Sequence, residues 1–193
     1  MIAIIDYQAG NTTSVVNAIK SLGAACIVTD DPKVIKTANK VILPGVGSAG
    51  PAMESLKTKG LDQVIKLLET PFLGICLGLQ LMCEFSEEDN TPCLGIFDSK
   101  VKKFPPKEKV PHMGWNSHTM VKGELFKDID HAEDFYFVHS YYVEQNKSEI
   151  ATGDYIVDFA SAINKNNFYG VQFHPEKSAN PGMKLLQNFL KLQ

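Results

Sequence analysis

The sequence contains no arginine, because all 19 of its basic side chains belong to lysine. Arginine carries a planar guanidinium that grips carboxylates and phosphates through two parallel hydrogen bonds. That kind of clamp is therefore absent from every binding site of this chain. We attribute the absence to compositional bias and draw no functional conclusion from it.

Other shortages exclude further classes of protein. The net charge is only −3, so no basic excess points to nucleic acid or to a membrane surface. No apolar run reaches the roughly 18 residues that a membrane span needs. The four cysteines are irregularly spaced and form no CxxC pair, which argues against a zinc site. The opening "MIAIIDYQAG" lacks a charged leader region, so we expect no signal peptide and a cytoplasmic protein with free thiols.

The first half of the chain alternates between strand and helix patterns. Short apolar runs predict strands over residues 1–6, 25–30, 40–43 and 71–76. Helical patterns occupy residues 12–22, 31–38, 52–69 with a break near Gly60, and 77–84. This alternation predicts an α/β fold in which helices cover both faces of a mostly parallel central sheet.

The pattern changes after about residue 90. Strand-like segments at 95–104, 134–144, 149–165 and 167–174 predict antiparallel additions to the sheet in the C-terminal half. The segment "FPPKEKVP" reads as a mobile or partner-facing loop, and residues 181–192 read as a closing helix. The chain has no repeat and no long linker, so we expect one domain over residues 1–193.

Cys76 lies between two glycines where a strand pattern meets a helix pattern, in Gly74-Ile75-Cys76-Leu77-Gly78. A nucleophile at a sharp strand-to-helix turn is the nucleophile-elbow arrangement, in which side chains on the flanking residues would clash. The turn exposes the thiol at the carboxyl end of the strand and at a helix N-terminus, which favours thiolate. The alternative reading is a packed core cysteine.

A cysteine nucleophile needs a base, and the base needs a group that orients it. His174 follows a strand pattern directly, so it also belongs at a strand's carboxyl end. Glu176 comes two residues later, where its carboxylate can hydrogen-bond the imidazole. The alternative is an ordinary surface turn, but two strand-end matches favour a Cys-His-Glu triad.

An oxyanion hole needs two backbone donors near the nucleophile. The N–H group of Leu77, directly after Cys76, is a candidate for the first. Peptide groups of Gly45 and Val46 in "LPGVG" are candidates for the second, although an ordinary strand-to-helix loop has the same appearance.

The segments "GICLGLQ", "LPGVG" and "FHPEKS" together resemble class I glutamine amidotransferases. Within that family, "IIDYQAGN", "PHMGWN" and "FYFVHSYY" resemble the HisH group, the glutaminase subunits of imidazole glycerol phosphate synthase. The resemblance runs from residue 2 to about residue 190. It implies a single flavodoxin-like glutamine amidotransferase type-1 domain.

The resemblance also implies an activity. Cys76 would attack the amide of glutamine, and the ammonia released would pass to a (β/α)8-barrel cyclase, HisF. That partner would use it to form imidazole glycerol phosphate and AICAR in histidine biosynthesis. We expect no cofactor, no metal, no nucleic acid and no membrane partner.

Further residues carry over by resemblance alone. Gln80 and Glu88 can also be read as solvated surface, Trp115 as a core residue and Lys177 as a free surface lysine. Gln8, Thr12 and Thr13 depart from the family pattern near the expected partner face. The expected substrate-binding residues are Gly47, Gln80, Glu88, His139, Ser140 and Tyr141, and the expected interface residues are Asn11, Pro111, His112, Met113, Trp115, Asn116 and Lys177.

Three other functions stay open on the sequence. A HisH paralogue would supply ammonia to another acceptor, such as a surface-sugar pathway, from an identical site. A stand-alone cysteine hydrolase or peptidase would share the fold, and a non-catalytic subunit would have no use for the triad. Outside the site, we expect Cys26 and Cys83 to be packed thiols, and His118 and His131 to be surface residues.

Overall fold

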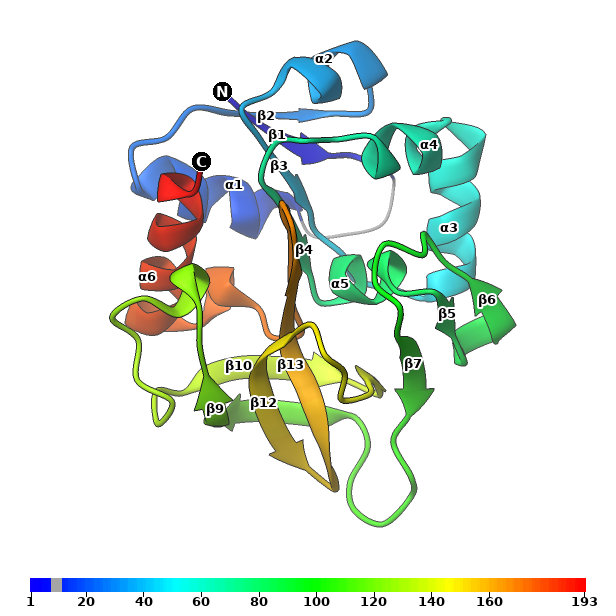
Figure 1. The fold of residues 1–193 in the computed structure, drawn as a ribbon, viewed down its shortest axis with the longest axis vertical. Helices are drawn as coiled ribbons and strands as arrows, with labels where there is room; N and C mark the ends of the chain where they lie inside the picture. Colours follow the sequence, from blue (N-terminus) through cyan, green and yellow to red (C-terminus); the bar gives the residue numbers. More distant parts are fainter. Residues whose placement is uncertain (8–11) are drawn as a thin grey trace.

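The computed structural model describes residues 1–7 and 12–193. Its N-terminal half alternates strands and helices as the sequence predicts (Figure 1). The break near Gly60 is confirmed, and Gly60 has a φ of +66°, which a residue without Cβ adopts at little cost. The elements are β1 (Ile2–Ile5), α1 (Thr12–Ser21), β2 (Cys26–Thr29), α2 (Pro32–Thr37), β3 (Lys40–Leu43), α3 (Ala49–Thr58), α4 (Leu61–Lys66), β4 (Phe72–Ile75) and α5 (Leu77–Met82).

The C-terminal half is dominated by strands and closes with one long helix. The elements are β5 (Phe85–Ser86), the 3₁₀ turn η1 (Glu88–Asn90), β6 (Thr91–Pro92), β7 (Lys100–Lys103), β8 (His112–Asn116), β9 (His118–Val121), η2 (Glu124–Phe126), β10 (Phe135–His139), β11 (Tyr141–Val143), β12 (Glu149–Tyr155), β13 (Val157–Lys165), β14 (Phe168–Val171), η3 (Pro175–Lys177) and α6 (Ala179–Lys191). Strands β8 and β9 were not predicted. None of the helices in the described part of the chain has the length and apolar character to span a bilayer.

The central sheet confirms the predicted α/β architecture. Strands β2, β1, β3, β4 and β14 lie side by side and run parallel. Strand β13 then pairs antiparallel with β14, and β11, β12 and β7 extend the antiparallel part. Strands β8 and β10 form a separate two-stranded antiparallel sheet. The carboxyl ends of β3, β4 and β14 therefore meet at one edge of the parallel region.

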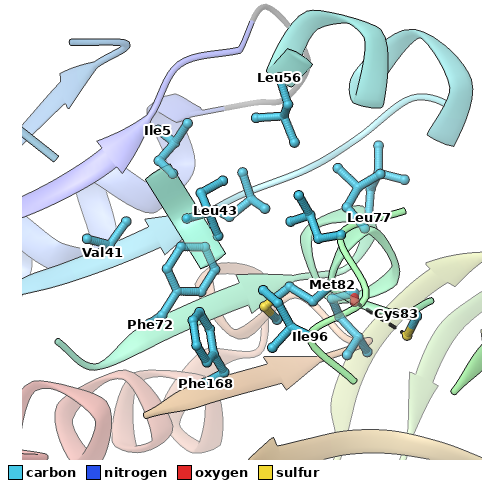
Figure 2. Packing of buried hydrophobic residues seen from close by; sticks show 14 of the residues in the cluster. Ile5, Val41, Leu43, Leu56, Phe72, Leu77, Met82, Cys83, Ile96 and Phe168 are labelled. Carbon is cyan, nitrogen blue, oxygen red and sulfur yellow. Dashed lines mark hydrogen bonds between the residues drawn. The ribbon is translucent and has the colours of Figure 1, made fainter. Parts of the chain in front are cut away.

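Helices cover the two faces of the parallel sheet, and each face has its own apolar core. In β1, Ile2 and Ile4 join the core under α1 and α6, whereas Ala3 and Ile5 join the core under α2 to α5. Figure 2 shows part of the second core, in which Phe72 and Phe168 pack together. Successive strand residues point to opposite faces, so a strand covered on both sides reads as one apolar run.

The expectation that His118 is a surface residue is wrong. His118 is only 3% exposed and packs edge-on against Phe126, Phe135 and Phe173. Polar neighbours in the sequence hide this placement, because β9 turns the ring toward aromatic side chains that come from distant segments. The other expectations hold: Cys83 is fully buried, Cys26 is partly buried and His131 is exposed.

Candidate functional site

Cys76 occupies a strained turn between β4 and α5. Its backbone has φ 53° and ψ −107°, a conformation that residues with a side chain rarely adopt. Glycine is required on the helix side of the turn, because a Cβ on Gly78 would stand 2.0 Å from the carbonyl oxygen of Leu43. A Cβ on Gly74 would meet Met82 and the backbone of Gly78. The nucleophile-elbow geometry is therefore present, and both positions require glycine because neighbouring atoms lie too close for a Cβ.

The sulfur of Cys76 has two polar neighbours besides the predicted base. The thiol donates a long hydrogen bond to the carbonyl of Val138, with 3.9 Å between sulfur and oxygen. The side-chain amide of Gln172 donates to the sulfur over 3.6 Å. Gln172 is fully buried, and its own carbonyl accepts a hydrogen bond from Gln80 at 2.9 Å. The sulfur thus lies at the end of a short buried polar chain.

His174 follows β14, the strand directly beside β4. Its Nδ1–H donates to Oε1 of Glu176 over 2.8 Å, which fixes the ring and leaves Nε2 without a hydrogen-bond partner in the described structure. Burial alone would lower the pKa of His174, but the Cys76 sulfur, as thiolate, and the carboxylate of Glu176 raise it to about 10. The imidazole thus interacts with both Cys76 and Glu176, an arrangement suited to hold a proton on the ring.

The loop after β3 is anchored at its start and open at its tip. The fully buried hydroxyl of Tyr7 donates to the carbonyl of Pro44 over 2.7 Å. A Cβ on Gly45 would stand 2.7 Å from both the Tyr7 hydroxyl and Leu77 Cβ, so this position is closed to a side chain. Val46 is 40% exposed, and Gly47 has a φ of +109°. The loop therefore lies against the start of α5, as an oxyanion-hole loop must.

A pocket of about 320 Å³ opens over Cys76. Small-molecule sites range from roughly 300 to 1,000 Å³, so the volume suits a small metabolite. Cys76 and His174 both line it, and Glu176 lies behind His174. Gly45 does not line it. The other predicted residues in its wall are Val46, Gly47, Leu77, Gln80, Glu88, Pro111, His139, Ser140 and Tyr141.

The pocket wall combines acceptors with neutral donors. Glu88 accepts a hydrogen bond from the backbone N–H of Ala49 at 2.9 Å, which holds its carboxylate at the N-terminus of α3. Burial and the neighbouring Asp89 raise the pKa of Glu88, against the effect of that bond. Gln80 is 4% exposed and donates to the carbonyl of Tyr141 at 3.0 Å. No lysine is among the described residues that line the pocket.

The expected interface residues divide between the surface and the interior. Met113 and Trp115 are 56% and 54% exposed, and they alternate along β8 with the buried His112. Trp115 packs edge-on against Tyr136, and Lys177 lies over the same tyrosine ring. We call Met113, Trp115, Tyr136 and Lys177 the outer face.

Three expected interface residues are not part of this outer face. His112 is only 4% exposed, Asn116 is partly buried and Pro111 lines the pocket. Asn11 and the departure at Gln8 lie outside the described residues.

Sequence reasoning missed four residues near the site: Tyr7, Tyr136, Val138 and Gln172. One signal was available for Gln172, which interrupts an apolar run two positions before His174. Residues two apart on an extended segment share a side, so a polar residue there points the same way as the base. Val138 acts through a backbone carbonyl, which no side-chain pattern reveals.

Comparisons with known proteins show the family to which this chain belongs. Residues 3–192 match the family model described as glutamine amidotransferase class-I. An imidazole glycerol phosphate synthase subunit HisH from Bacteroides fragilis is 54% identical, over 99% of each chain. A HisH subunit from Bacteroides thetaiotaomicron is 49% identical, again over 99% of each. The solved structure of a glutamine amidotransferase from Thermotoga maritima shares the fold, with a TM-score of 0.71, 16% identity, and coverage of 98% of this chain and 96% of that one.

Proposed function

We propose that this chain, which belongs to the class I glutamine amidotransferase family and within it to the HisH subunits, hydrolyses glutamine and delivers the ammonia to a HisF cyclase. The single observation that carries the chemistry is the array at the sheet edge. Cys76 and His174 line one pocket, and Glu176 holds the imidazole from behind at 2.8 Å. The wider role, as the glutaminase subunit of imidazole glycerol phosphate synthase in histidine biosynthesis, follows from the HisH relatives.

The proposed reaction starts from the ion pair that the raised pKa of His174 favours. His174 Nε2 holds the proton of the Cys76 thiol, and the sulfur attacks, as thiolate, the side-chain carbonyl carbon of glutamine. The C–N bond then breaks, the imidazolium returns the proton to the departing nitrogen, and ammonia leaves. A glutamyl thioester remains on Cys76. Water then attacks the thioester with His174 as base, which releases glutamate and restores the free thiol.

The negative charge that develops on the substrate oxygen needs donors that are already in place. The backbone N–H of Leu77 and the peptide groups of Gly45 and Val46 are the proposed donors. Tyr7 supports this role, because its hydrogen bond to Pro44 holds the start of the loop. Glu88 is the proposed partner of the substrate's amino group, and backbone N–H groups and neutral donors serve its carboxylate.

The partner is proposed to dock on the outer face. Aromatic side chains exposed to solvent are favoured at the centres of interfaces, and Trp115 is the only tryptophan of the chain. Lys177 is exposed and adds one positive charge that an acidic residue of the partner can pair with. The four cysteines are free, which agrees with a cytoplasmic protein.

The test is a pair of cysteine variants assayed with a HisF subunit. Cys76→Ala is expected to abolish glutamine-dependent formation of imidazole glycerol phosphate and to leave synthesis from ammonium salts intact. Cys93→Ala, which removes a free thiol outside the pocket, is the matched control and should retain both. Loss of ammonium-dependent synthesis in Cys76→Ala would contradict the assigned role, and failure to bind HisF would favour the paralogue that serves another acceptor.

A further inference from the structure

His112 and His139 face each other across the two-stranded sheet. They are direct partners in the register of β8 and β10, and both side chains point inward, at 4% and 5% exposure. Nδ1 of His112 lies 3.0 Å from Nε2 of His139. Neither ring takes part in the proton transfers proposed above, and the expected roles of His139 at the pocket and of His112 at the interface do not explain why the two rings are linked.

The proton positions along this pair follow from the acceptor at its inner end. His139 Nδ1 lies 2.8 Å from the carbonyl oxygen of Tyr141, which can only accept, so Nδ1 carries the proton. Burial lowers the pKa of His139 to about 3 and that of His112 to about 4, so both rings are neutral. His139 Nε2 is therefore an acceptor, and His112 Nδ1 must be the donor.

The outer end of the pair has a fixed orientation as well. Asn116 Oδ1 accepts from the N–H of Ser117 at 2.9 Å, and Asn116 Nδ2 donates to the carbonyl of Asp154 at 3.0 Å. These two bonds turn Nδ2 toward His112 Nε2, at 3.4 Å. In this series of hydrogen bonds, each donor thus points from β8 toward the pocket.

The inner end of this series of hydrogen bonds reaches Cys76. The Tyr141 carbonyl accepts from both His139 and Gln80, and Gln80 also donates to Gln172, whose amide reaches the Cys76 sulfur. We propose that His112 and His139 are positioning residues of the glutaminase site, because their linked rings fix the Tyr141 carbonyl from the strand that carries the outer face. This inference rests on the proposed function and adds to it a physical link between the partner side and the glutamine pocket.

The first test measures the protons directly in the wild-type chain. Long-range ¹⁵N–¹H NMR of the imidazoles distinguishes the two neutral tautomers, with the His112 signals assigned by their loss in His112→Phe and the His139 signals by their loss in His139→Phe. His112 and His139 are both expected to carry the proton on Nδ1 at neutral pH. An Nε2–H tautomer in either ring would overturn the proposal, whatever the variants do.

The second test compares two buried histidines of the same neighbourhood, in complex with HisF. His112→Phe keeps an aromatic ring that stacks on Tyr155 and Phe137 but removes the donor to His139. We expect kcat/KM for glutamine to fall by about 10-fold or more, since a buried acceptor loses its partner. His118→Phe is the matched control, because His118 is equally buried among aromatics yet makes no hydrogen bond in the described structure.

The conservative variant separates positioning from packing. The side-chain amide of His112→Asn can place a donor near the position of Nδ1. This variant should therefore keep kcat/KM within about 3-fold of wild type, a smaller change than the loss of one hydrogen bond causes. Ammonium-dependent synthesis should be unchanged in all three variants. Equal kcat/KM in His112→Phe and His118→Phe, or equal loss in His112→Asn and His112→Phe, would overturn the inference alone. A wild-type complex without glutamine turnover would instead overturn the proposed function and this inference with it.

Discussion

The amide nitrogen of Gln172 lies 3.6 Å from the sulfur of Cys76, and the amide oxygen of the same residue accepts from Gln80 at 2.9 Å. The acceptor bond fixes the amide orientation, so Gln172 presents a donor to the nucleophile and not a lone pair. A donor at this place stabilises a sulfur that carries negative charge. Gln172 is thus placed to assist the step in which His174 removes the thiol proton.

Gln172→Leu is expected to slow the attack of the sulfur. A hydrogen bond to a charged group is worth about 1.5–3 kcal/mol, so kcat/KM for glutamine should fall by about 10-fold or more. Alkylation of Cys76 by iodoacetamide at pH 7 should slow in parallel. Ser161→Ala is the control, because the Ser161 hydroxyl is also buried but has no hydrogen-bond partner in the described structure. Equal rates in both variants would exclude this role.

Tyr7→Phe removes one hydroxyl from beneath the loop that follows β3. The Pro44 carbonyl would lose its buried donor, which should lower the free energy of unfolding by about 1–2 kcal/mol. Because that loop supplies proposed oxyanion donors, kcat should fall more than KM changes. Steady-state glutaminase kinetics with HisF and urea unfolding check the two effects. Tyr142→Phe, which trims a partly buried tyrosine outside the pocket, should change neither by a comparable amount.

The strained turn at Cys76 predicts an unusual order of stabilities. Positive φ in a residue with a side chain costs about 1–3 kcal/mol, and glycine avoids this cost while losing about 0.4–1 kcal/mol through its more flexible unfolded chain. Cys76→Gly should therefore be at least as stable as Cys76→Ala, although neither hydrolyses glutamine. Chemical denaturation of the two inactive variants measures the difference. A glycine variant that is clearly less stable would show that the turn is not strained.

The pair formed by His174 and Glu176 predicts a loss of stability at alkaline pH. The pKa of His174 is raised to about 10 in the folded chain, against about 6.5 when unfolded. The folded state therefore binds more protons between these values, and its stabilisation, complete below pH 6.5, disappears as pH rises toward 10. In Glu176→Gln one cause of the raised pKa is gone, so the free energy of unfolding should depend less steeply on pH there. Parallel curves for the two proteins would contradict the assigned pairing.

At acid pH the buried His118 predicts the opposite slope. Burial lowers its pKa to about 4, so the unfolded chain binds the proton first and stability falls as pH drops from about 6.5 toward 4. His118→Phe removes this term and also two buried nitrogens that have no hydrogen-bond partner. The variant should match or exceed wild-type stability at pH 7 and lose less at pH 5. A variant less stable at pH 7 by more than about 1 kcal/mol would mean that the ring has a partner or a packing role.

Much of the fold could be predicted because local rules and tertiary structure agree in the N-terminal half. The helix expected over residues 31–38 is α2, where Pro32 opens the helix and the Asp31 side chain accepts a hydrogen bond from the backbone N–H of Lys33. Gly74 and Gly78 flank Cys76 for the steric reason expected of an elbow.

Strand β8 escaped prediction because its pattern is reversed. Its exposed side chains are the apolar Met113 and Trp115, whereas the inward positions are the polar His112 and Asn116. A prediction from hydrophobic alternation assigns the apolar side of a strand to the core, which is the wrong side here. The buried face is satisfied by hydrogen bonds with partners far along the chain, and no local pattern reports them.

The two sheets divide the site between them. Cys76 and His174 follow neighbouring strands of the large sheet, whereas Met113 and Trp115 belong to the small one. Substitutions on the exposed side of β8 can therefore accumulate without disturbing the groups that cleave the amide. Changes confined to that exposed side are a route by which one ammonia-generating enzyme is fitted to new acceptor enzymes while its buried histidines, and with them its chemistry, stay the same.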